Sequence, residues 1–268
     1  MTANIHPTAV IQPGAQIGAD AVIGPYCVIG PRVILGDRCK LHSHVVLDGI
    51  TTIGEECEIF PFASLGHKPQ DLKYNGEESR LIIGKRNKIR EYCTMNPGTS
   101  GDRMETCVGD DCLFMMSTHV AHDCVVGNRV VMANATTLAG HVVVEDEVRF
   151  GGLCAVRQFV RIGRNAMIGG MTGVENDVIP YGMVVGERGY LAGLNLVGMQ
   201  RKGVDKDEIN RVRQAYQDLF ESTEDSLAVR LDKVANDYAD LPMFNAIVEF
   251  VRGKGKLGVC MPARKENA

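Results

Sequence analysis

Large apolar residues recur at every sixth position along most of the chain. The series occupies positions 5–65, 83–95 and 108–180. Its one exception is Pro180, and the fifth residue of each hexad is Ala, Cys, Val or Thr except at Pro69 and Asn87. Two positions held to such narrow residue sets over so long a stretch predict a solenoid, in which each repeat buries its apolar face against its neighbours.

The repeat resembles that of the hexapeptide-repeat acyltransferases, whose fold is a left-handed parallel β-helix. The resemblance implies that three hexads form one triangular coil, so that residues eighteen apart stack on one another, about 4.8 Å apart. We therefore expect residues 1–186 to form an all-β left-handed parallel β-helix. Its hand is taken from the family, because ordinary parallel crossovers are almost always right-handed.

Two insertions interrupt the series, at 71–82 and 101–107. If three hexads form a coil, both insertions follow the side of the triangle that contains His122, and both leave the solenoid at one corner. Loops that project repeatedly from one edge of a solenoid usually shape a binding site. We expect the functional site along that edge.

A helical pattern replaces the hexads after residue 186. Three helices are expected, over residues 205–222, 223–238 and 243–251. The first has an acidic first turn, Thr223 is placed to cap the second, and Pro242 is placed to open the third. Residues 187–268 are thus predicted to form a small C-terminal α-helical domain.

Composition narrows the function classes. The net charge of −4 argues against a general nucleic-acid binder. We expect a cytoplasmic protein, because the chain shows neither a secretory signal nor an apolar stretch long enough to span a bilayer. The nine cysteines include no C-x-x-C pair, and most of them occupy the fifth hexad position, where cysteine serves as a small buried residue. These are Cys27, Cys39, Cys57, Cys93, Cys112, Cys124 and Cys154.

Several residues with chemical potential form a column in this register. His122 is the third residue of its hexad, a position that we expect to point outward on a face. Gly140 falls one coil later and should stack on His122, with His141 beside it. We place Arg157 and Gln158 one coil beyond His141.

This column suits acyl transfer from a thioester to an alcohol or an amine. The acceptor must lose a proton as it attacks the carbonyl, and the neutral imidazole of His122 is a natural base near pH 7. Asp123 would orient that ring and stabilise its cation. The N–H of Gly140, unshielded by a Cβ atom, would stabilise the oxyanion.

Longer motifs point to one particular family of hexapeptide-repeat acyltransferases. Over essentially the whole chain, the sequence is similar to the UDP-N-acetylglucosamine 3-O-acyltransferase family of lipid A biosynthesis. The segments that carry the similarity are PQDLKY, HVAHDC, TLAGHV, AVRQF, IGGMTGV and GLNLVGMQRKG. It implies the first step of that pathway, transfer of a 3-hydroxyacyl group from the phosphopantetheine thioester of acyl carrier protein to the 3-position of UDP-N-acetylglucosamine, without a metal or further cofactor. It also implies a homotrimer with active sites between subunits.

The resemblance gives the same three catalytic roles as the chemistry above and adds binding roles. Asn195 and Arg201 would hold the uridine diphosphate end, where a guanidinium suits phosphate. Gly170 matches the position that ends the acyl groove. The sugar and diphosphate pocket would be lined by Asp71, Lys73, His119, His141, Arg157 and Gln158.

Some positions depart from better-known relatives. Asn96 and Arg157 stand where those proteins have histidine, and Val197 stands where they have glutamate. The departures leave open whether the acceptor carries a 3-hydroxyl or a 3-amino group. The docking surface for the acidic acyl carrier protein also stays open. Its candidates are Arg157, Arg161, Arg164, Arg188 and the C-terminal lysines, which are otherwise scattered solvated charges.

Three alternative functions compete with this interpretation. A zinc enzyme similar to the γ-type carbonic anhydrases would use His119, His122 and His141 as ligands, but such proteins normally end in one long helix. The related N-acyltransferase of the same pathway carries an extra N-terminal domain, for which the repeats beginning at Ile5 leave no room. A non-catalytic scaffold would not need the histidine, aspartate and glycine column.

Overall fold

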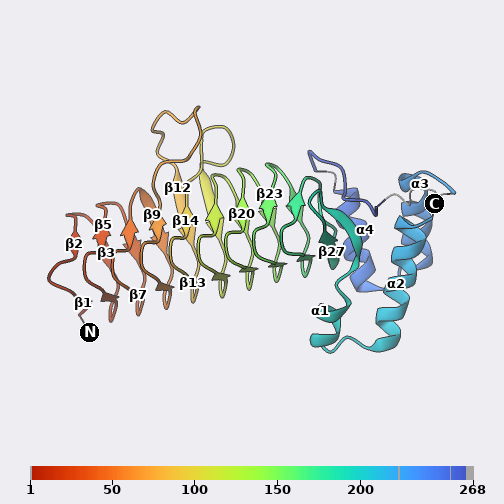
Figure 1. The fold of residues 1–268 in the computed structure, drawn as a ribbon, viewed down its shortest axis with the longest axis horizontal. Helices are drawn as coiled ribbons and strands as arrows, with labels where there is room; N and C mark the ends of the chain where they lie inside the picture. The colour runs from red at the N-terminus through yellow and green to blue at the C-terminus, as the bar shows by residue number, and fades with distance from the viewer. Residues whose placement is uncertain (1, 223, 254, 264–268) are drawn as a thin grey trace.

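The computed structural model describes residues 2–222, 224–253 and 255–263. The chain winds into a long triangular prism of short strands, each side of which is one sheet (Figure 1). Sheet A contains β1 (Asn4–Ile5), β4 (Val22–Ile23), β7 (Lys40–Leu41), β10 (Glu58–Ile59), β13 (Lys88–Ile89), β16 (Leu113–Phe114), β19 (Val131–Met132), β22 (Arg149–Phe150), β25 (Met167–Ile168), β27 (Gly182–Val185) and β28 (Tyr190–Leu194). Sheet B contains β2 (Val10–Ile11), β5 (Val28–Ile29), β8 (Val46–Leu47), β11 (Ser64–Leu65), β14 (Thr94–Met95), β17 (His119–Val120), β20 (Thr137–Leu138), β23 (Ala155–Val156) and β26 (Gly173–Val174). Sheet C contains β3 (Gln16–Ile17), β6 (Ile34–Leu35), β9 (Ile50–Ile53), β12 (Arg80–Ile83), β15 (Glu105–Val108), β18 (Val125–Val126), β21 (Val143–Val144) and β24 (Arg161–Ile162).

Each coil contributes one strand to every sheet, in the order A, B, C. Asn4 pairs in parallel with Val22, and Val22 with Lys40, so the stagger of eighteen residues confirms three hexads per coil. The first hexad residue of each strand points inward, and from Ile23 onward these side chains are almost completely buried. The resulting core is a continuous apolar column along the prism axis.

The fifth hexad position fills the same interior. Its seven cysteines are buried, and their thiols donate to carbonyls of the next coil, as from Cys39 to Gly54 and from Cys124 to Ala139, both at 3.1 Å. Burial raises the pKa of Cys124 to about 12, which keeps that thiol protonated at neutral pH. The prediction that these cysteines are small buried residues is confirmed.

The third and fourth hexad residues form the turns at the corners of the prism. The fourth residue has a left-handed backbone, with φ of 59° at Asp123 and 66° at His141. His122 therefore lies at a corner, and the prediction that it points outward on a face is wrong. We name the corners A/B, B/C and C/A after the sheets that they join. Their fourth-position columns include Tyr26 to Met171 at A/B, Asp123 to Phe159 at B/C and Asp20 to Asn165 at C/A.

Both insertions leave the prism at the B/C corner, as predicted. The first loop joins β11 to β12 and the second joins β14 to β15. Figure 1 shows them projecting together from one side of the prism. The strands that follow the loops begin earlier than expected, at Arg80 and Glu105.

The C-terminal region differs from the expectation in detail. Sheet A continues beyond residue 186 through β28, which pairs antiparallel with β27. The helices are α1 (Leu196–Arg201), α2 (Lys206–Phe220), α3 (Leu227–Asp237) and α4 (Pro242–Arg252). The hexad and helix patterns both missed α1, which is a short helix capped by the side chain of Asn195. Ser226 caps α3, whereas Thr223, the cap expected from the sequence, lies outside the described residues.

A buried ion pair attaches the helices to the end of the prism. Arg161 binds the fully buried carboxylate of Asp177 at 2.8 Å, and its guanidinium lies 4.4 Å from the ring centre of Phe250 in α4. The chain after α4 then returns to the last coil, where Asp177 exchanges backbone hydrogen bonds with Gly258 and Cys260. Within the described part of the chain, no helix has the length and apolar character needed to cross a bilayer.

Candidate active site

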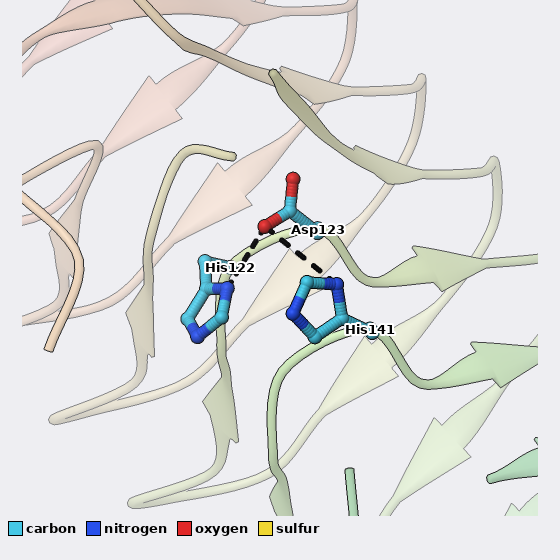
Figure 2. Close-up of side chains that lie close together, drawn as sticks. All are labelled: His122, Asp123 and His141. Carbon is cyan, nitrogen blue, oxygen red and sulfur yellow. Dashed lines mark hydrogen bonds and ion pairs between the residues drawn. The ribbon is translucent and has the colours of Figure 1, made fainter. Parts of the chain in front are cut away.

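A histidine and a carboxylate form a buried pair at the B/C corner. His122 Nδ1 lies 2.8 Å from Asp123 Oδ2, and the two side chains are 8% and 0% exposed (Figure 2). Because a carboxylate accepts hydrogen bonds, Nδ1 carries the proton and Nε2 is left free. The pair has the arrangement of an oriented general base.

The carboxylate of Asp123 is held by the second loop. Thr99 donates its hydroxyl at 2.6 Å and its amide at 3.0 Å, and the amide of Arg103 donates at 3.2 Å. Burial alone would raise the pKa of Asp123, but the hydrogen bonds from Thr99, His122 and Arg103 outweigh it and lower that pKa below its ordinary value. Asp123 is therefore ionised at neutral pH and accepts the Nδ1 proton of His122.

Gly140 lies directly over His122, as the eighteen-residue stagger predicts. A Cβ atom on Gly140 would lie 2.6 Å from His122 Nε2, so any other residue would displace the imidazole. The N–H of a third hexad residue has no backbone acceptor in this coil. At the C/A corner a side chain one coil later accepts it, as Asp110 does for Lys85. Within the described residues the Gly140 N–H donates no such bond, which leaves it available to a ligand beside Nε2.

His141 completes the cluster. Its Nδ1 lies 2.9 Å from Asp102 Oδ2. The same atom lies 3.8 Å from Asp123 Oδ2, and the His141 ring stands edge-on to His122, with centroids 4.9 Å apart (Figure 2). The residue one coil beyond His141 is Phe159, whose ring stacks on His141 at 4.4 Å. The placement of Arg157 in that position is wrong by two residues, since Arg157 follows β23 and lies exposed over Ala139.

His119 and Asn96 lie on the adjoining face of sheet B. Burial first, and then the nearby His122, lowers the pKa of His119, whose Nδ1 lies 2.7 Å from Thr94 Oγ1. His119 is thus neutral at neutral pH. Asn96 is buried and donates to the carbonyl of His67 at 3.0 Å, so its amide anchors the first loop.

The first loop brings Asp71 and Lys73 to this corner, in a turn where the Lys73 amide donates to the Asp71 carboxylate at 3.0 Å. Glu77 joins the two loops. One of its carboxylate oxygens accepts from the amide and hydroxyl of Ser100, and the other accepts from the amide of Asn75 at 2.8 Å. The loops around the site are therefore held by polar contacts.

The remaining predicted residues lie elsewhere on the prism. Asn195 and Arg201 line a cavity of about 660 Å³ between α1 and sheet A. Asn195 uses its amide to cap α1 and to bind the carbonyl of Asn165. Gly170 lies exposed at the A/B corner. A single chain thus brings the predicted catalytic residues together, but it does not bring the predicted nucleotide and acyl residues to them.

The geometry favours acid–base chemistry over metal binding. His122, Asp123 and His141 have potential ligand atoms within 4.8 Å of one another, but His119, the third ligand of the zinc alternative, is not in that group. The Asp123 carboxylate already accepts hydrogen bonds from Thr99, His122 and Arg103. Such a saturated carboxylate orients a histidine better than it binds a cation.

Comparison with known proteins identifies the family of the chain. A family model described as "Udp N-acetylglucosamine O-acyltransferase; Domain 2" matches residues 177–260, and a bacterial transferase hexapeptide model matches residues 2–31 and 14–49. The acyl-[acyl-carrier-protein]–UDP-N-acetylglucosamine O-acyltransferase of Rhizobium leguminosarum bv. trifolii is 46% identical over 98% of this chain and 96% of its own. The corresponding protein of Methylobacterium radiotolerans is 56% identical over 76% of this chain and 75% of its own. The chain belongs to this O-acyltransferase family.

A solved structure extends the likeness to three dimensions. UDP-N-acetylglucosamine O-acyltransferase from Moraxella catarrhalis has a TM-score of 0.90 and 40% identity, covering 96% of this chain and 99% of that chain. The hexapeptide prism and the helical region that follows it are therefore features of the family.

We predict that the Glu77 link between the loops weakens in acid. Hydrogen bonds, chiefly from the Ser100 amide, lower the pKa of Glu77 from 4.5 to about 2. Because the pKa of Glu77 is lower in the folded than in the unfolded protein, its ionised carboxylate stabilises the folded state. This contribution is complete above pH 4.5 and is lost as the pH falls from 4.5 towards 2. Hydrogen-exchange protection of the two loops should therefore differ between wild type and Glu77→Ala at pH 7, and the difference should shrink at pH 3.

Glu78→Ala is the matched control, because Glu78 is a neighbouring exposed carboxylate that pairs with Arg32. It should leave loop protection unchanged at both pH values. Equal protection in wild type and Glu77→Ala at pH 7 would contradict the link.

Proposed function

We propose that this chain transfers a 3-hydroxyacyl group from acyl carrier protein to the 3-hydroxyl of UDP-N-acetylglucosamine, the first step of lipid A biosynthesis, with His122 as the general base. The observation that carries the proposal is the position of His122 Nε2. Asp123 holds the opposite ring nitrogen, and Gly140 lies over the free one, where a Cβ atom would meet it. Family membership supports the choice of substrates, and the geometry supports the proposed roles of the residues.

The reaction follows from this arrangement. His122 Nε2 takes the proton of the sugar 3-hydroxyl as that oxygen attacks the thioester carbonyl carbon. The Gly140 N–H stabilises the oxyanion. The C–S bond then breaks, and the phosphopantetheine thiolate takes the proton from the imidazolium. A 3-amino acceptor would follow the same proton balance and yield an amide.

The first functional prediction concerns His122. His122→Ala should keep the fold but lose about 10²–10⁴-fold in turnover, the usual magnitude for a positioned general base. Mass spectrometry of the product from UDP-N-acetylglucosamine, with a panel of acyl carrier protein thioesters, measures turnover and identifies the acyl group. A folded variant with near-normal turnover would exclude His122 as the base, and wild type without an acylated product would exclude the proposed activity.

The placement of the predicted binding residues supports a site shared between subunits. His122 lies at the B/C corner, whereas the cavity with Asn195 and Arg201 opens beside sheet A and the C/A corner. A substrate can touch both sets if a second chain places its sheet A against sheet B of the first. We infer a homotrimer in which the A/B corners meet at a common axis and each site uses two chains.

The surface of the A/B corner supports this arrangement. Tyr26, His44, Phe62 and Tyr92 form an exposed ring ladder, with successive centroids 5.0, 5.0 and 5.2 Å apart. The tyrosine and phenylalanine rings remain about half exposed. The C/A corner instead carries alternating charges, with ion pairs such as Arg38–Glu56 and Arg129–Glu147. An exposed aromatic column is typical of a contact surface, whereas a charged column is typical of a solvated one.

Mixed trimers test the shared site. His122→Ala and Arg201→Ala should each be inactive, but refolding them together should restore activity. In random trimers the expected recovery is about a quarter of the wild-type rate, which is the probability that a site draws an intact residue from each chain. No recovery in trimers shown to be mixed would contradict the shared site.

Variants of the aromatic ladder test whether the A/B corner is the contact surface. Phe62→Glu with Tyr92→Glu should reduce the mass measured by light scattering, because buried like charges oppose association. Glu56→Lys changes charge at the C/A corner and should leave the mass unchanged. An unchanged mass for the ladder variant would place the contact surface elsewhere.

Gly170 is the proposed end of the acyl groove. It lies at the A/B corner between two and three coils beyond His122, which is roughly 10–14 Å along the axis at about 4.8 Å per coil. That length suits an acyl chain near 3-hydroxytetradecanoyl. Gly170 is not needed for packing, because a Cβ atom there would meet its nearest neighbour, the Gly152 carbonyl, at an ordinary 3.4 Å. The adjacent Gly169 is tighter, since its Cβ atom would lie 2.9 Å from Val185.

Gly170→Met should therefore fold and shorten the groove. With donors of about ten, twelve and fourteen carbons, preference should move to the shorter donors with little loss of rate on the best one. Competition between the three donors measures the shift. An unchanged length profile would mean that the groove ends elsewhere.

The 3-hydroxyl as the acceptor atom, a basic docking surface for acyl carrier protein and the cytoplasmic location of the protein stay predictions.

A further inference from the structure

Two histidines at the B/C corner compete for one carboxylate oxygen. Asp123 Oδ2 lies 2.8 Å from His122 Nδ1 and 3.8 Å from His141 Nδ1. Both Nδ1 atoms are therefore within ion-pair distance of the same oxygen. A closer approach of His141 would weaken the hydrogen bond that orients His122.

Asp102 is the closer carboxylate partner of His141. Its Oδ2 lies 2.9 Å from His141 Nδ1, closer than Asp123 does. Asp102 belongs to the same loop whose Thr99 and Arg103 hold Asp123. One short loop thus supplies a separate anchor for each histidine, and His122 keeps Asp123.

We propose that Asp102 is a positioning residue that withholds His141 from Asp123 and so reserves Asp123 for His122. Asp102 also fixes the proton of His141 on Nδ1, since a carboxylate can only accept there. The inference rests on the proposed role of His122 for its kinetic consequence. Its structural part, the choice of partner by each ring, holds whatever the substrate.

The stacked rings restrain His141 on its other side. Phe159 lies nearly parallel to His141, with an interplanar angle of 9°, and the ammonium of Lys256 lies 3.7 Å from the Phe159 ring centre. The ammonium must cover the face of Phe159 that His141 leaves free. The C-terminal segment thus steadies the ring against which His141 stacks, and Asp102 sets the rotation of His141 within that stack.

The test is a double-mutant cycle of Asp102→Ala and His141→Phe, with Asp102→Asn as the conservative variant. In wild type, Asp102→Ala should lower kcat about tenfold, the magnitude of one charge-assisted hydrogen bond. Asp102→Asn should retain most of kcat, because its amide oxygen still accepts from Nδ1. His141→Phe keeps a ring against Phe159 without a nitrogen, and in that background Asp102→Ala should change kcat less than twofold, because no competing donor remains.

A second measurement is independent of catalysis. In protein labelled with ¹⁵N-histidine, NMR should show His122 with its proton on Nδ1 in wild type and in Asp102→Asn. Asp102→Ala should perturb the signals of both His122 and His141. Asp111→Ala is the matched control, because Asp111 is 39% exposed against 36% for Asp102 and pairs with Arg86 at the C/A corner. It should leave both signals unchanged.

The outcomes are distinguishable. An equal loss of kcat from Asp102→Ala with and without His141 would mean that Asp102 acts only through the loop, and would overturn the proposal. Unchanged NMR signals in Asp102→Ala would also overturn it. Perturbed His122 signals in a chain that proves to have a different activity would support Asp102 as a positioning residue and contradict only the proposed reaction.

Discussion

Closure of the coil after three hexads is the constraint on which the other features of this molecule depend. Because the backbone returns to the same corner every eighteen residues, a residue type chosen at one hexad position becomes a column along the prism. The third hexad residue shows the consequence most clearly, since its N–H has no acceptor in the coil. Side chains such as Asp110 accept it at the C/A corner, and prolines such as Pro25 and Pro61 remove it at the A/B corner. At Gly140 it stays available beside His122.

The six-residue period made most of the fold predictable. Burial dictates the first and fifth hexad residues, and the family resemblance added that three hexads form a coil. Together they allowed the sheets, the corner of the insertions and the stacking of Gly140 on His122 to be predicted by counting. The loop contacts could not be predicted, because the conformation around Thr99 and Asp102 depends on the carboxylate of Asp123 and follows no period. Phe159 could have been found by counting eighteen residues from His141. The helix α1 gave too short a pattern to detect.

The candidate site combines residues of the prism with residues of the two loops. Gly140 and the backbone of the two histidines belong to coils whose hydrogen bonds repeat along the whole prism. The loops have no apolar core of their own, and polar groups such as Glu77 and Asp123 hold them in place. The predicted reacting groups and the loops around them are thus held by different interactions, the backbone ladders of the prism and side-chain hydrogen bonds respectively.

The two ends of the prism are unequal, and this difference limits how the molecule can polymerise. A stack of parallel coils has unpaired strand edges at both ends, and head-to-tail addition through such edges would build an open filament. At the C-terminal end, Gly258 and Cys260 occupy the backbone groups of Asp177, and the helices lie beyond them. At the N-terminal end, Ile5 and Val10 stay largely exposed. Since head-to-tail growth needs both edges, covering one is enough to stop a filament.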